Sequence, residues 1–409
     1  MIYGMTIPRP LIIAAFGLLS ACSCTSDSVN YDAITYTGID ELEQQDFALL
    51  HGQRVGLITN HTGIDRNGVS TIAAMHRSSK VNLVAIFSPE HGISGVLDIA
   101  EIDDDIETAT GLRVVSLYGQ HRQPTAEMLA GIDTLVFDIQ DIGTRFYTYI
   151  STMGLAMQAA ADSDVDFVVL DRPNVIGGTS VSGPVLDEGA QSFVGFHRIP
   201  VRHGMTVGEL AGLFRAELEL DLDLHVVPMR NWRRSDYFTD TGLPWVNPSP
   251  NMRSVNAAVL YPGIGLLETT NLSVGRGTDT PFELVGAPWL DGEGLAHALN
   301  LVQIEGIRIE SITFKPNASK FQNEVCSGIK LSVIDPALAR PLKLGLLIAV
   351  HLSANYGNQW DIDAYDRLLG NSDTLSDVRA AKPVNEIIDA WQSELLNFRE
   401  RRAAHLLYD

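Results

Sequence analysis

Short apolar runs rich in β-branched residues recur along the first half of the chain, and a stretch of helical character follows most of them. The runs cover residues 54–60, 81–87, 112–119, 133–139, 166–171 and 223–229, and the helical patterns cover 70–78, 125–131, 144–163 and 206–218. Strands that alternate with helices favour a parallel sheet with right-handed crossovers. Because the runs are almost continuously apolar, both faces of the sheet are expected to be covered. The sequence therefore predicts an α/β fold with a mostly parallel sheet.

The pattern changes between about residue 235 and residue 290, where Gly, Pro, Asn and Thr are frequent. Long irregular stretches inside compact proteins are usually functional or disordered, and the aromatic residues here argue against disorder. Regular patterns then resume, with a helix over 292–304, strands near 306–316 and 328–335, and helices over 341–357 and around 383–406. We therefore expect a first domain over residues 33–255 and a smaller α+β domain over residues 256–409.

The N-terminus has the pattern of an export signal. Arg9 precedes the apolar run LIIAAFGLL, which is too short to span a bilayer comfortably and leads into Leu-Ser-Ala-Cys. This tetrapeptide resembles a bacterial lipobox, in which the cysteine, here Cys22, is lipidated. We expect a lipoprotein signal peptide over residues 1–22, a polar tether over 23–32, and a protein held in the cell envelope by its lipid. The alternative is an ordinary signal peptide that is cleaved nearby.

Charge and cysteine content exclude several classes of protein. The 409 residues have a formal net charge of −21, which argues against a nucleic-acid partner because phosphate backbones are repelled. Cys22, Cys24 and Cys326 are the three cysteines, too few for a disulfide framework or a cysteine-based metal site. No G-x-G-x-x-G follows the first strand, so a dinucleotide cofactor is not supported.

Polar and ionisable residues follow four of the predicted strands. The carboxyl ends of parallel strands meet at one edge of a sheet, where ligands bind. The residues at that edge are Asn60, His61, Glu90, His91, Asp138, Asp141, Arg145, Tyr147, Asp171 and Arg172. Each has a structural alternative: Asp141 as a helix cap, the arginines as partners of neighbouring aspartates, and the histidines as structural side chains. Their coincidence at one edge favours a site.

Three reaction classes can be considered for polar groups at such an edge. Carbohydrate hydrolysis needs a proton donor and a group that stabilises an oxocarbenium-like centre. A metal ion would require Glu90, His91, Asp138, Asp141 and His61 to converge, but no strong metal-binding spacing is present. Serine hydrolysis is not supported, because no G-x-S-x-G occurs.

The irregular segment adds residues typical of sugar recognition. Amides and charged groups at Asn251, Glu268, Asn271, Arg276 and Asp279 occur with aromatic residues at Trp245, Tyr261 and Trp289. Aromatic faces stack on pyranose rings, and planar amides bind hydroxyl groups. The alternative is a domain linker packed on the sheet.

Several long motifs occur in order from about residue 45 to the C-terminus. They are GLITNHTGID, FSPEHGISG, DIQDIGTRFYTYISTM, DRPNVIGG, GPVLD, RHGMTVGEL, NPSPNM and YPGIGLLETTNLSVGRGTDTPFE. Together they resemble the bacterial exo-β-N-acetylmuramidase family of the NamZ type. Val175 and Thr269 depart from the pattern, where Pro and Gly are expected.

This resemblance implies a Rossmann-like domain, a smaller C-terminal domain and an active cleft between them. It implies removal of terminal β-1,4-linked N-acetylmuramic acid from the non-reducing ends of peptidoglycan fragments. Glu90 becomes the candidate proton donor. The second group is either the substrate's 2-acetamido group, oriented by Asp138 or Asp171, or a carboxylate acting directly. Arg145, Arg172 or Arg276 is expected to bind the lactyl carboxylate.

The remaining candidates are assigned in the same way. His91 and Tyr147 join the catalytic set, and the expected substrate-binding residues are Asn60, His61, Asp141, Arg145, Arg172, His203, Asn251, Glu268, Asn271, Arg276 and Asp279. No metal or cofactor is expected. Two other functions stay open: a muropeptide-binding lipoprotein without catalysis, and a metal-dependent hydrolase of another envelope substrate.

Overall fold

The computed structural model describes residues 1–4 and 34–409, of which Ile34–Asp409 form one compact unit. The predicted signal peptide beyond its first four residues, Cys22 and the predicted tether lie outside the described residues. Among the helices that the structure describes, none is long and apolar enough to cross a membrane.

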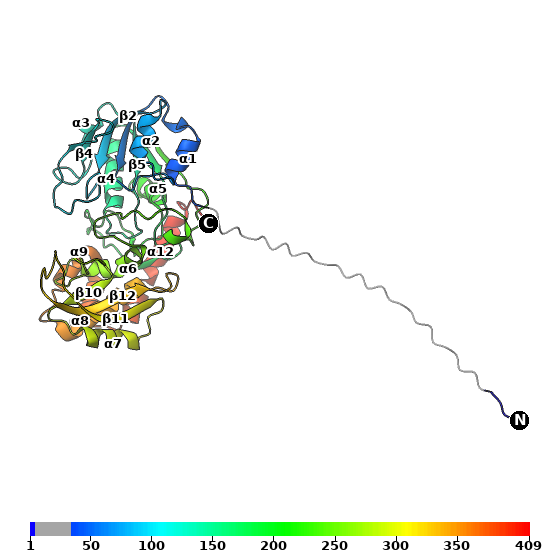
Figure 1. Ribbon diagram of the computed structural model, residues 1–409, viewed down its shortest axis with the longest axis vertical. Helices are drawn as coiled ribbons and strands as arrows, with labels where there is room; N and C mark the ends of the chain where they lie inside the picture. The colour runs from blue at the N-terminus through cyan, green and yellow to red at the C-terminus, as the bar shows by residue number, and fades with distance from the viewer. Residues whose placement is uncertain (5–33) are drawn as a thin grey trace. The chain divides into compact units, whose positions relative to one another are not determined.

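A seven-stranded sheet forms the first part of this unit (Figure 1). In spatial order its strands are β3 (Asp105–Ile106), β4 (Arg113–Ser116), β2 (Asn82–Ser88), β1 (Arg54–Thr59), β5 (Thr134–Asp138), β6 (Asp166–Leu170) and β9 (Leu224–Val227). All neighbours pair in parallel except β3 and β4. Without β3, the strands follow the 3-2-1-4-5-6 order of Rossmann sheets, so the order reverses between β1 and β5. The predicted α/β fold with a mostly parallel sheet is confirmed.

Helices cover both faces of this sheet. The helices are α1 (Gly38–Gln44), α2 (Thr71–Arg77), α3 (Ala126–Leu129), α4 (Tyr149–Asp162) and α5 (Val207–Glu217). Leu57 of β1 packs in the cluster that contains Leu42 of α1 and Met75 of α2, whereas its neighbour Ile58 packs with Met153 of α4. Successive strand residues point to opposite faces, so an apolar run throughout is what a doubly covered sheet requires.

The C-terminal part contains a three-stranded antiparallel sheet in the order β10 (Leu284–Ala287), β12 (Cys326–Val333), β11 (Ile307–Phe314). Its helices are α6 (Val255–Ile264), α7 (Gly292–Leu301), α8 (Pro341–Tyr356), α9 (Asp366–Leu369), α10 (Ser372–Arg379), α11 (Val384–Ala390) and α12 (Gln392–Ala403). A two-stranded hairpin of β7 (Ser182–Val185) and β8 (Pro200–Arg202) packs against α12. Short 3₁₀ turns occupy Ala48–Leu50, Phe238–Asp240, Gly265–Leu267 and Asp363–Tyr365. This architecture is the smaller α+β part that we expected.

Helix α4 begins later than the sequence pattern indicates. The prediction started it at residue 144, whereas the structure starts it at Tyr149. Thr144 instead forms a β-bridge with Arg202, and the Arg145 amide donates to the Val201 carbonyl at 2.9 Å. The bridge to β8 at Thr144 and the turn that follows it therefore keep these residues out of the helix, which helical periodicity does not reveal.

The segment over 235–290 is more regular than predicted, because it contains α6 and β10. Pro262 and Gly263 within α6 resemble loop residues in the sequence. In the structure, a Cβ at Gly263 would lie 1.9 Å from the Pro341 carbonyl oxygen, so a glycine is needed where α6 meets α8. Close helix packing, and not local propensity, explains this helix.

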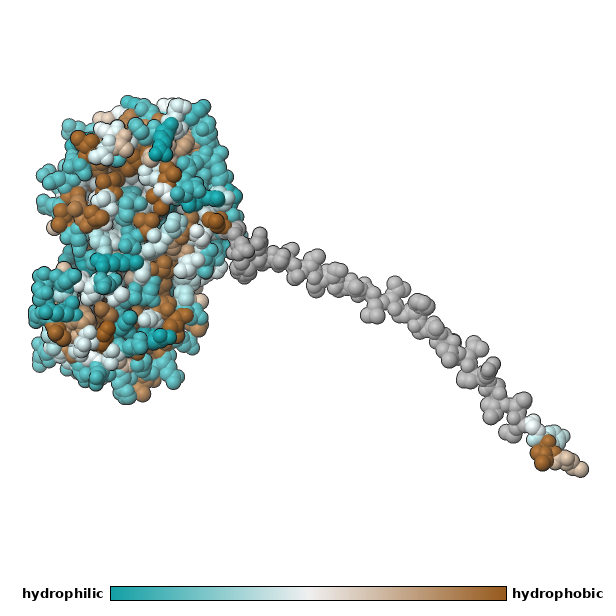
Figure 2. Space-filling view, in the orientation of Figure 1, coloured by the Kyte–Doolittle hydropathy of each residue, from teal (hydrophilic) through white to brown (hydrophobic). Residues whose placement is uncertain are grey.

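The predicted terminal helix is divided at Trp391 into α11 and α12. The chain end then returns to the first sheet, where the Tyr408 hydroxyl donates to Asp171 at 2.6 Å. Figure 2 shows hydrophilic residues over much of one face, with apolar residues gathered in separate patches.

Candidate active site

Glu90 lies in the turn that follows β2. His91 and Gly92 both have φ of +72°, a left-handed conformation that costs a non-glycine residue roughly 1–3 kcal/mol. The Nδ1 atom of His91 donates to the Leu97 carbonyl at 2.6 Å, which holds the turn together. The Glu90 carboxylate accepts a hydrogen bond from the Thr148 hydroxyl. Thr148 is the N-cap residue of α4, but its side chain makes no capping bond, so its hydroxyl serves Glu90.

Glu90 lines a cavity of about 490 Å³, a size typical of small-molecule sites. The part of the unit that contains the seven-stranded sheet and the C-terminal part both contribute residues to it. The lining residues are Glu90, His91, Asp98, Phe146, Tyr147, Thr148, Tyr149, Val194, Ser249, Asn251, Tyr261, Glu268, Thr269, Arg276, Phe282, Lys320, Ala364, Arg367 and Leu368. The cavity thus brings together six of the predicted site residues: Glu90, His91, Tyr147, Asn251, Glu268 and Arg276. The expected cleft between the two parts is present.

Three tyrosines form one wall of this cavity. Tyr147 packs edge-on against Tyr149 and Tyr261, with ring centroids 5.1 and 5.8 Å apart. The Tyr147 hydroxyl is buried and has no hydrogen-bond partner among the described residues. Burial raises the pKa of Tyr147 well above its usual value, so the phenol keeps its proton at neutral pH. Tyr147 therefore contributes a buried, protonated phenol to the wall of the cavity.

A charged network forms another part of the lining. Arg276 pairs with Glu268 and, at 2.5 Å, with Asp98, which also accepts from Asn251 at 3.1 Å. Burial alone would lower the pKa of Arg276, but the two carboxylates outweigh it and hold that pKa above its usual value. The pKa of Asp98 is lowered because Arg276 and Asn251 outweigh the opposing effect of burial. Lys320 donates to the Glu268 carbonyl.

Of the Arg and Lys side chains in this lining, Arg367 and Lys320 form no ion pair among the described residues, and Lys320 is already bound to the Glu268 carbonyl. Arg367 lies in α9, near the C-terminal end of that short helix, and is exposed. A guanidinium that points to solvent beside a polar cavity is available for a ligand carboxylate. Arg367 lies in none of the motifs given above and follows no strand of the first sheet, so the sequence pattern does not identify it.

Asp138 and Arg172 bind each other and do not line the cavity. Arg172 Nε donates to Asp138 Oδ1 at 2.5 Å and Nη2 to Oδ2 at 2.9 Å, and Thr71 completes the carboxylate's partners. Asp138 is fully buried and Arg172 is 5% exposed. The pair connects the end of β5, which carries Asp138, to the residues after β6, which include Arg172. Arg172 also donates to the Ile64 carbonyl. The geometry gives both residues a structural role in place of contact with a ligand.

The Asp171 carboxylate also forms its hydrogen bonds with other parts of the fold. Its carboxylate accepts from the Thr206 hydroxyl at 2.7 Å, the Gly208 amide at 2.8 Å and the Tyr408 hydroxyl. Burial raises the pKa of Asp171 to about 6 despite these donors. The arrangement closes the N-terminus of α5 and anchors the chain end, away from the Glu90 cavity.

Arg145 and His203 are buried outside the cavity lining. Arg145 donates to the carbonyls of Pro184, Ile199, Leu368 and Leu369, which ties the β7–β8 hairpin to the end of α9. Burial lowers the pKa of Arg145 to about 9. Burial, with help from nearby arginines, lowers the pKa of His203 to about 3, so its ring is neutral. Both residues stabilise the arrangement around the site.

Asn60, His61 and Asp141 follow strands β1 and β5 and are not part of the cavity lining. Asn60 accepts from the amide and hydroxyl of Thr62, and His61 donates through Nε2 to the Asn247 carbonyl at 2.7 Å. Burial lowers the pKa of His61, so its ring is predominantly neutral. Asp141 accepts from the Gly143 amide at 2.6 Å, and burial raises its pKa to about 7. The alternative role of Asp141 as a helix cap is excluded, because α4 begins at Tyr149 with Thr148 as its N-cap residue, and Asp141, predicted to bind substrate, is not part of the cavity lining.

The last two predicted residues lie elsewhere. Asn271 binds the Gln359 carbonyl at 2.6 Å and the Asp361 amide at 2.8 Å, which orders the loop after α8. Asp279 is exposed and does not line the cavity. Conversely, the structure adds Asp98, Thr148, Lys320 and Arg367, which come from a loop, a helix cap and the C-terminal part.

The five groups that we considered for a metal site do not converge. Within residues 34–409, the three carboxylates of Asp40, Glu43 and Asp65 have oxygens within 4.8 Å of one another, and no trio from Glu90, His91, Asp138, Asp141 and His61 does. Those three acids are outside the cavity lining. The donor geometry around Glu90 therefore fits acid–base chemistry by side chains.

Comparisons with known proteins agree with this geometry. Residues 55–256 match the family model of the N-terminal part of exo-beta-N-acetylmuramidase NamZ, and residues 259–408 match that of its C-terminal part. The peptidoglycan beta-N-acetylmuramidase NamZ of Bacillus subtilis strain 168 is 41% identical over 400 residues, which cover 96% of this chain and 97% of that protein.

Solved structures show the same fold. Two DUF1343 family proteins of Bacteroides fragilis NCTC 9343 superpose with TM-scores of 0.86 and 0.77, at 38% and 31% identity, each over 92% of this chain and 99% of its own. The motifs, the sheet order and these matches lead to one conclusion: the chain belongs to the NamZ family of exo-beta-N-acetylmuramidases.

Proposed function

We propose that this protein is an exo-acting glycoside hydrolase that releases terminal β-1,4-linked N-acetylmuramic acid from the non-reducing ends of peptidoglycan fragments. The observation that carries the proposal is a carboxyl group, Glu90, oriented by the Thr148 hydroxyl in the wall of a polar cavity. Glycosidases require such a positioned proton donor. Family membership supplies the substrate class, because the Bacillus relative is named for peptidoglycan.

Glu90 is the general acid in this proposal. Thr148 donates to Oε2 of the carboxyl group, so Oε1 carries the proton that passes to the glycosidic oxygen. As the bond to the leaving sugar breaks, the remaining carboxylate is stabilised by the same hydroxyl. After departure of the leaving sugar, Glu90 removes a proton from the attacking water.

The substrate's own 2-acetamido group is the nucleophile that the geometry favours. Asp138 and Asp171 are enclosed by other partners and do not line the cavity. The cavity's other two carboxylates, Asp98 and Glu268, are both paired with Arg276. A carboxylate engaged in this way is a poor nucleophile.

Arg367 binds the lactyl carboxylate of N-acetylmuramic acid. The three arginines suggested by the sequence are less suitable: Arg145 and Arg172 lie outside the cavity lining, and Arg276 already has two acidic partners. A free guanidinium offers a bidentate contact to a carboxylate. This contact distinguishes muramic acid from glucosamine, which has no lactyl group.

The protein is exported and held in the cell envelope through a lipid on Cys22. The support is the sequence Leu-Ser-Ala-Cys after a short apolar run. Location in the envelope would bring the enzyme to its polymer. Cys22→Ser should move the protein from the membrane fraction to the soluble fraction and remove the lipid mass from its N-terminal peptide. An unchanged mass and fractionation would argue for an ordinary signal peptide.

The decisive experiment measures hydrolysis by residues 27–409. A chromogenic β-N-acetylmuraminide and the matching β-N-acetylglucosaminide are compared, each with and without EDTA. We expect release from the muraminide alone, no effect of EDTA, and loss of activity in Glu90→Gln but not in Glu310→Gln, a control on an exposed position of β11.

Other results would favour the alternatives. Saccharide binding without hydrolysis would indicate a muropeptide-binding lipoprotein. Activity lost in EDTA and restored by a divalent ion would indicate a metal-dependent hydrolase. Full activity in Glu90→Gln would refute the proposed acid.

A further inference from the structure

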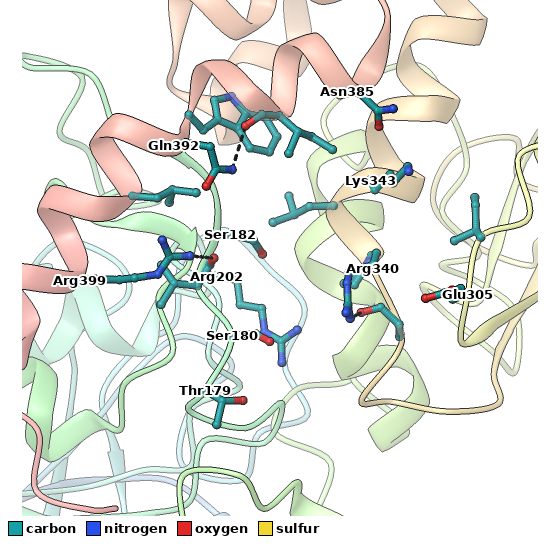
Figure 3. Close-up of a pocket in the computed structure, with 18 of the residues that line it drawn as sticks. Thr179, Ser180, Ser182, Arg202, Glu305, Arg340, Lys343, Asn385, Gln392 and Arg399 are labelled. Atoms are coloured by element: carbon teal, nitrogen blue, oxygen red, sulfur yellow. Dashed lines mark hydrogen bonds between the residues drawn. The ribbon is translucent and has the colours of Figure 1, made fainter.

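A second cavity, of about 740 Å³, shares no lining residue with the Glu90 cavity. It lies where β7 and β8 of the first part meet the start of α8, the loop before β11, and helices α11 and α12 (Figure 3). Four cationic side chains line it: Arg202, Arg340, Lys343 and Arg399. We call it the basic cavity. In Figure 3, Arg202 and Arg399 enter from one side, and Arg340 and Lys343 lie on the facing side.

The cations of the basic cavity are not neutralised by the fold. Within residues 34–409, none of the four forms an ion pair, and Glu305, an exposed residue, is the one acidic side chain of the described lining. Arg340 and Arg399 donate to backbone carbonyls of Ala337 and Val181, which carry no net charge. Four uncompensated positive charges converge here in a chain whose net charge is −21. Such clusters attract anions and focus their approach.

Arg202 provides the second, independent observation. Its side chain is 3% exposed, one Nη2 bond goes to the Ile176 carbonyl, and its Nε–H has no partner among the described residues. Burial lowers the pKa of Arg202, and the positive charge of Arg340 acts in the same direction, while Tyr237 opposes it. A buried guanidinium with an unused donor next to another cation is stabilised when an anion completes its hydrogen bonds.

The rest of the lining has groups that fit a peptide. Hydroxyl and amide side chains come from Thr179, Ser180, Ser182, Asn385 and Gln392, all labelled in Figure 3. An apolar wall comes from Leu342, Ile388, Trp391 and Leu395. An inorganic anion has no apolar surface that could be buried against such a wall. A ligand with carboxylates, amide groups and an apolar side chain would use all three kinds of surface.

We propose that the basic cavity binds a short acidic peptide, with its carboxylates on Arg202, Arg340, Lys343 and Arg399 and an apolar side chain against Trp391. The volume is sufficient for a ligand of this size, since small-molecule sites commonly span about 300–1,000 Å³. The inference does not rest on the proposed hydrolase activity, because it concerns different residues and a directly measured binding event.

The test is calorimetric titration of the purified protein with N-acetyl-Leu-Glu and with succinate, which carries the same charge without the apolar side chain. Lys343→Glu/Arg399→Glu is compared with Arg233→Glu/Lys315→Glu, a control that reverses two exposed cations outside both cavities. We expect the peptide to bind the unaltered protein and the control variant with equal affinity, and to bind both more tightly than succinate does. We expect its affinity for the cavity variant to be roughly tenfold lower.

Three results would overturn the inference: no peptide binding to the unaltered protein, equal peptide binding to the cavity variant, or succinate binding as tightly as the peptide. The melting temperature without ligand verifies that each variant is folded. If charge reversal prevents folding, Lys343→Gln/Arg399→Gln replaces it, and the same comparison applies with a smaller expected loss of affinity.

Discussion

The hydrogen bond from Thr148 to Glu90 should contribute to catalysis, and removing it should lower kcat/KM. Thr148→Val removes the hydroxyl and keeps the side-chain shape. The threonine makes no capping bond to α4, so the helix loses little by the change. The free energy at stake is that of a partly buried hydrogen bond to a carboxylate, about 1.5–3 kcal/mol. If that stabilisation acts in the transition state, kcat/KM falls roughly 10- to 150-fold.

The assay is hydrolysis of the chromogenic muraminide under saturating and subsaturating conditions. Thr269→Val is the matched control, because Thr269 lines the same cavity but donates to the Ala364 carbonyl. We expect Thr269→Val to have the smaller effect. In a double-mutant cycle, Thr148→Val should add little to Glu90→Gln, since both act through one carboxyl group. A kcat/KM within twofold of the unaltered enzyme in Thr148→Val would refute the orientation argument.

Three further changes test other parts of the site. Arg367→Met should raise KM for the muraminide roughly tenfold or more with little change in kcat, because it removes a contact to the lactyl carboxylate; an unchanged KM would exclude that contact. Asp138→Asn should lower the free energy of unfolding, measured with denaturant, by about 3–5 kcal/mol, since it leaves Arg172 buried without its charge partner. A variant that is fully stable but inactive would instead indicate a catalytic role for Asp138. Burial raises the pKa of Asp141 from 3.8 to about 7, so its contribution to stability is greatest below pH 3.8 and declines as the pH rises through 7. Asp141→Asn should therefore flatten the loss of stability between about pH 4 and pH 8, and parallel pH profiles of the two proteins would contradict the shift.

The proposed catalytic carboxyl group, Glu90, could be identified from the sequence because the features that mark it lie within one strand and the turn after it. The apolar run over 81–87 is followed by Pro-Glu-His-Gly after one residue and places Glu90 just beyond the carboxyl end of a strand, and β2 ends at Ser88, one residue later than the predicted run. His91 and Tyr147 follow strands in the same way and line the same cavity. The motifs also identified the family, which the comparisons confirm.

Sequence reasoning could not separate residues that face the cavity from residues that hold it together. Asp138 and Asp171 follow strands as Glu90 does, but each is enclosed by donors from elements distant in sequence. Which polar group at a strand end is left free depends on partners such as Arg172, Thr206 and Tyr408. No pattern within one strand and its loop contains that information.

The sequence by itself determined the α/β sheet, the α+β part that follows it and the position of Glu90, because periodic burial and strand-end chemistry are local properties of the chain. The tertiary structure alone decided the rest. It made α6 helical through contact with α8, began α4 at Tyr149 through pairing with β8, and placed Arg367 in the Glu90 cavity. These outcomes depend on long-range contacts, whose free energy overrides the weak preferences of local sequence.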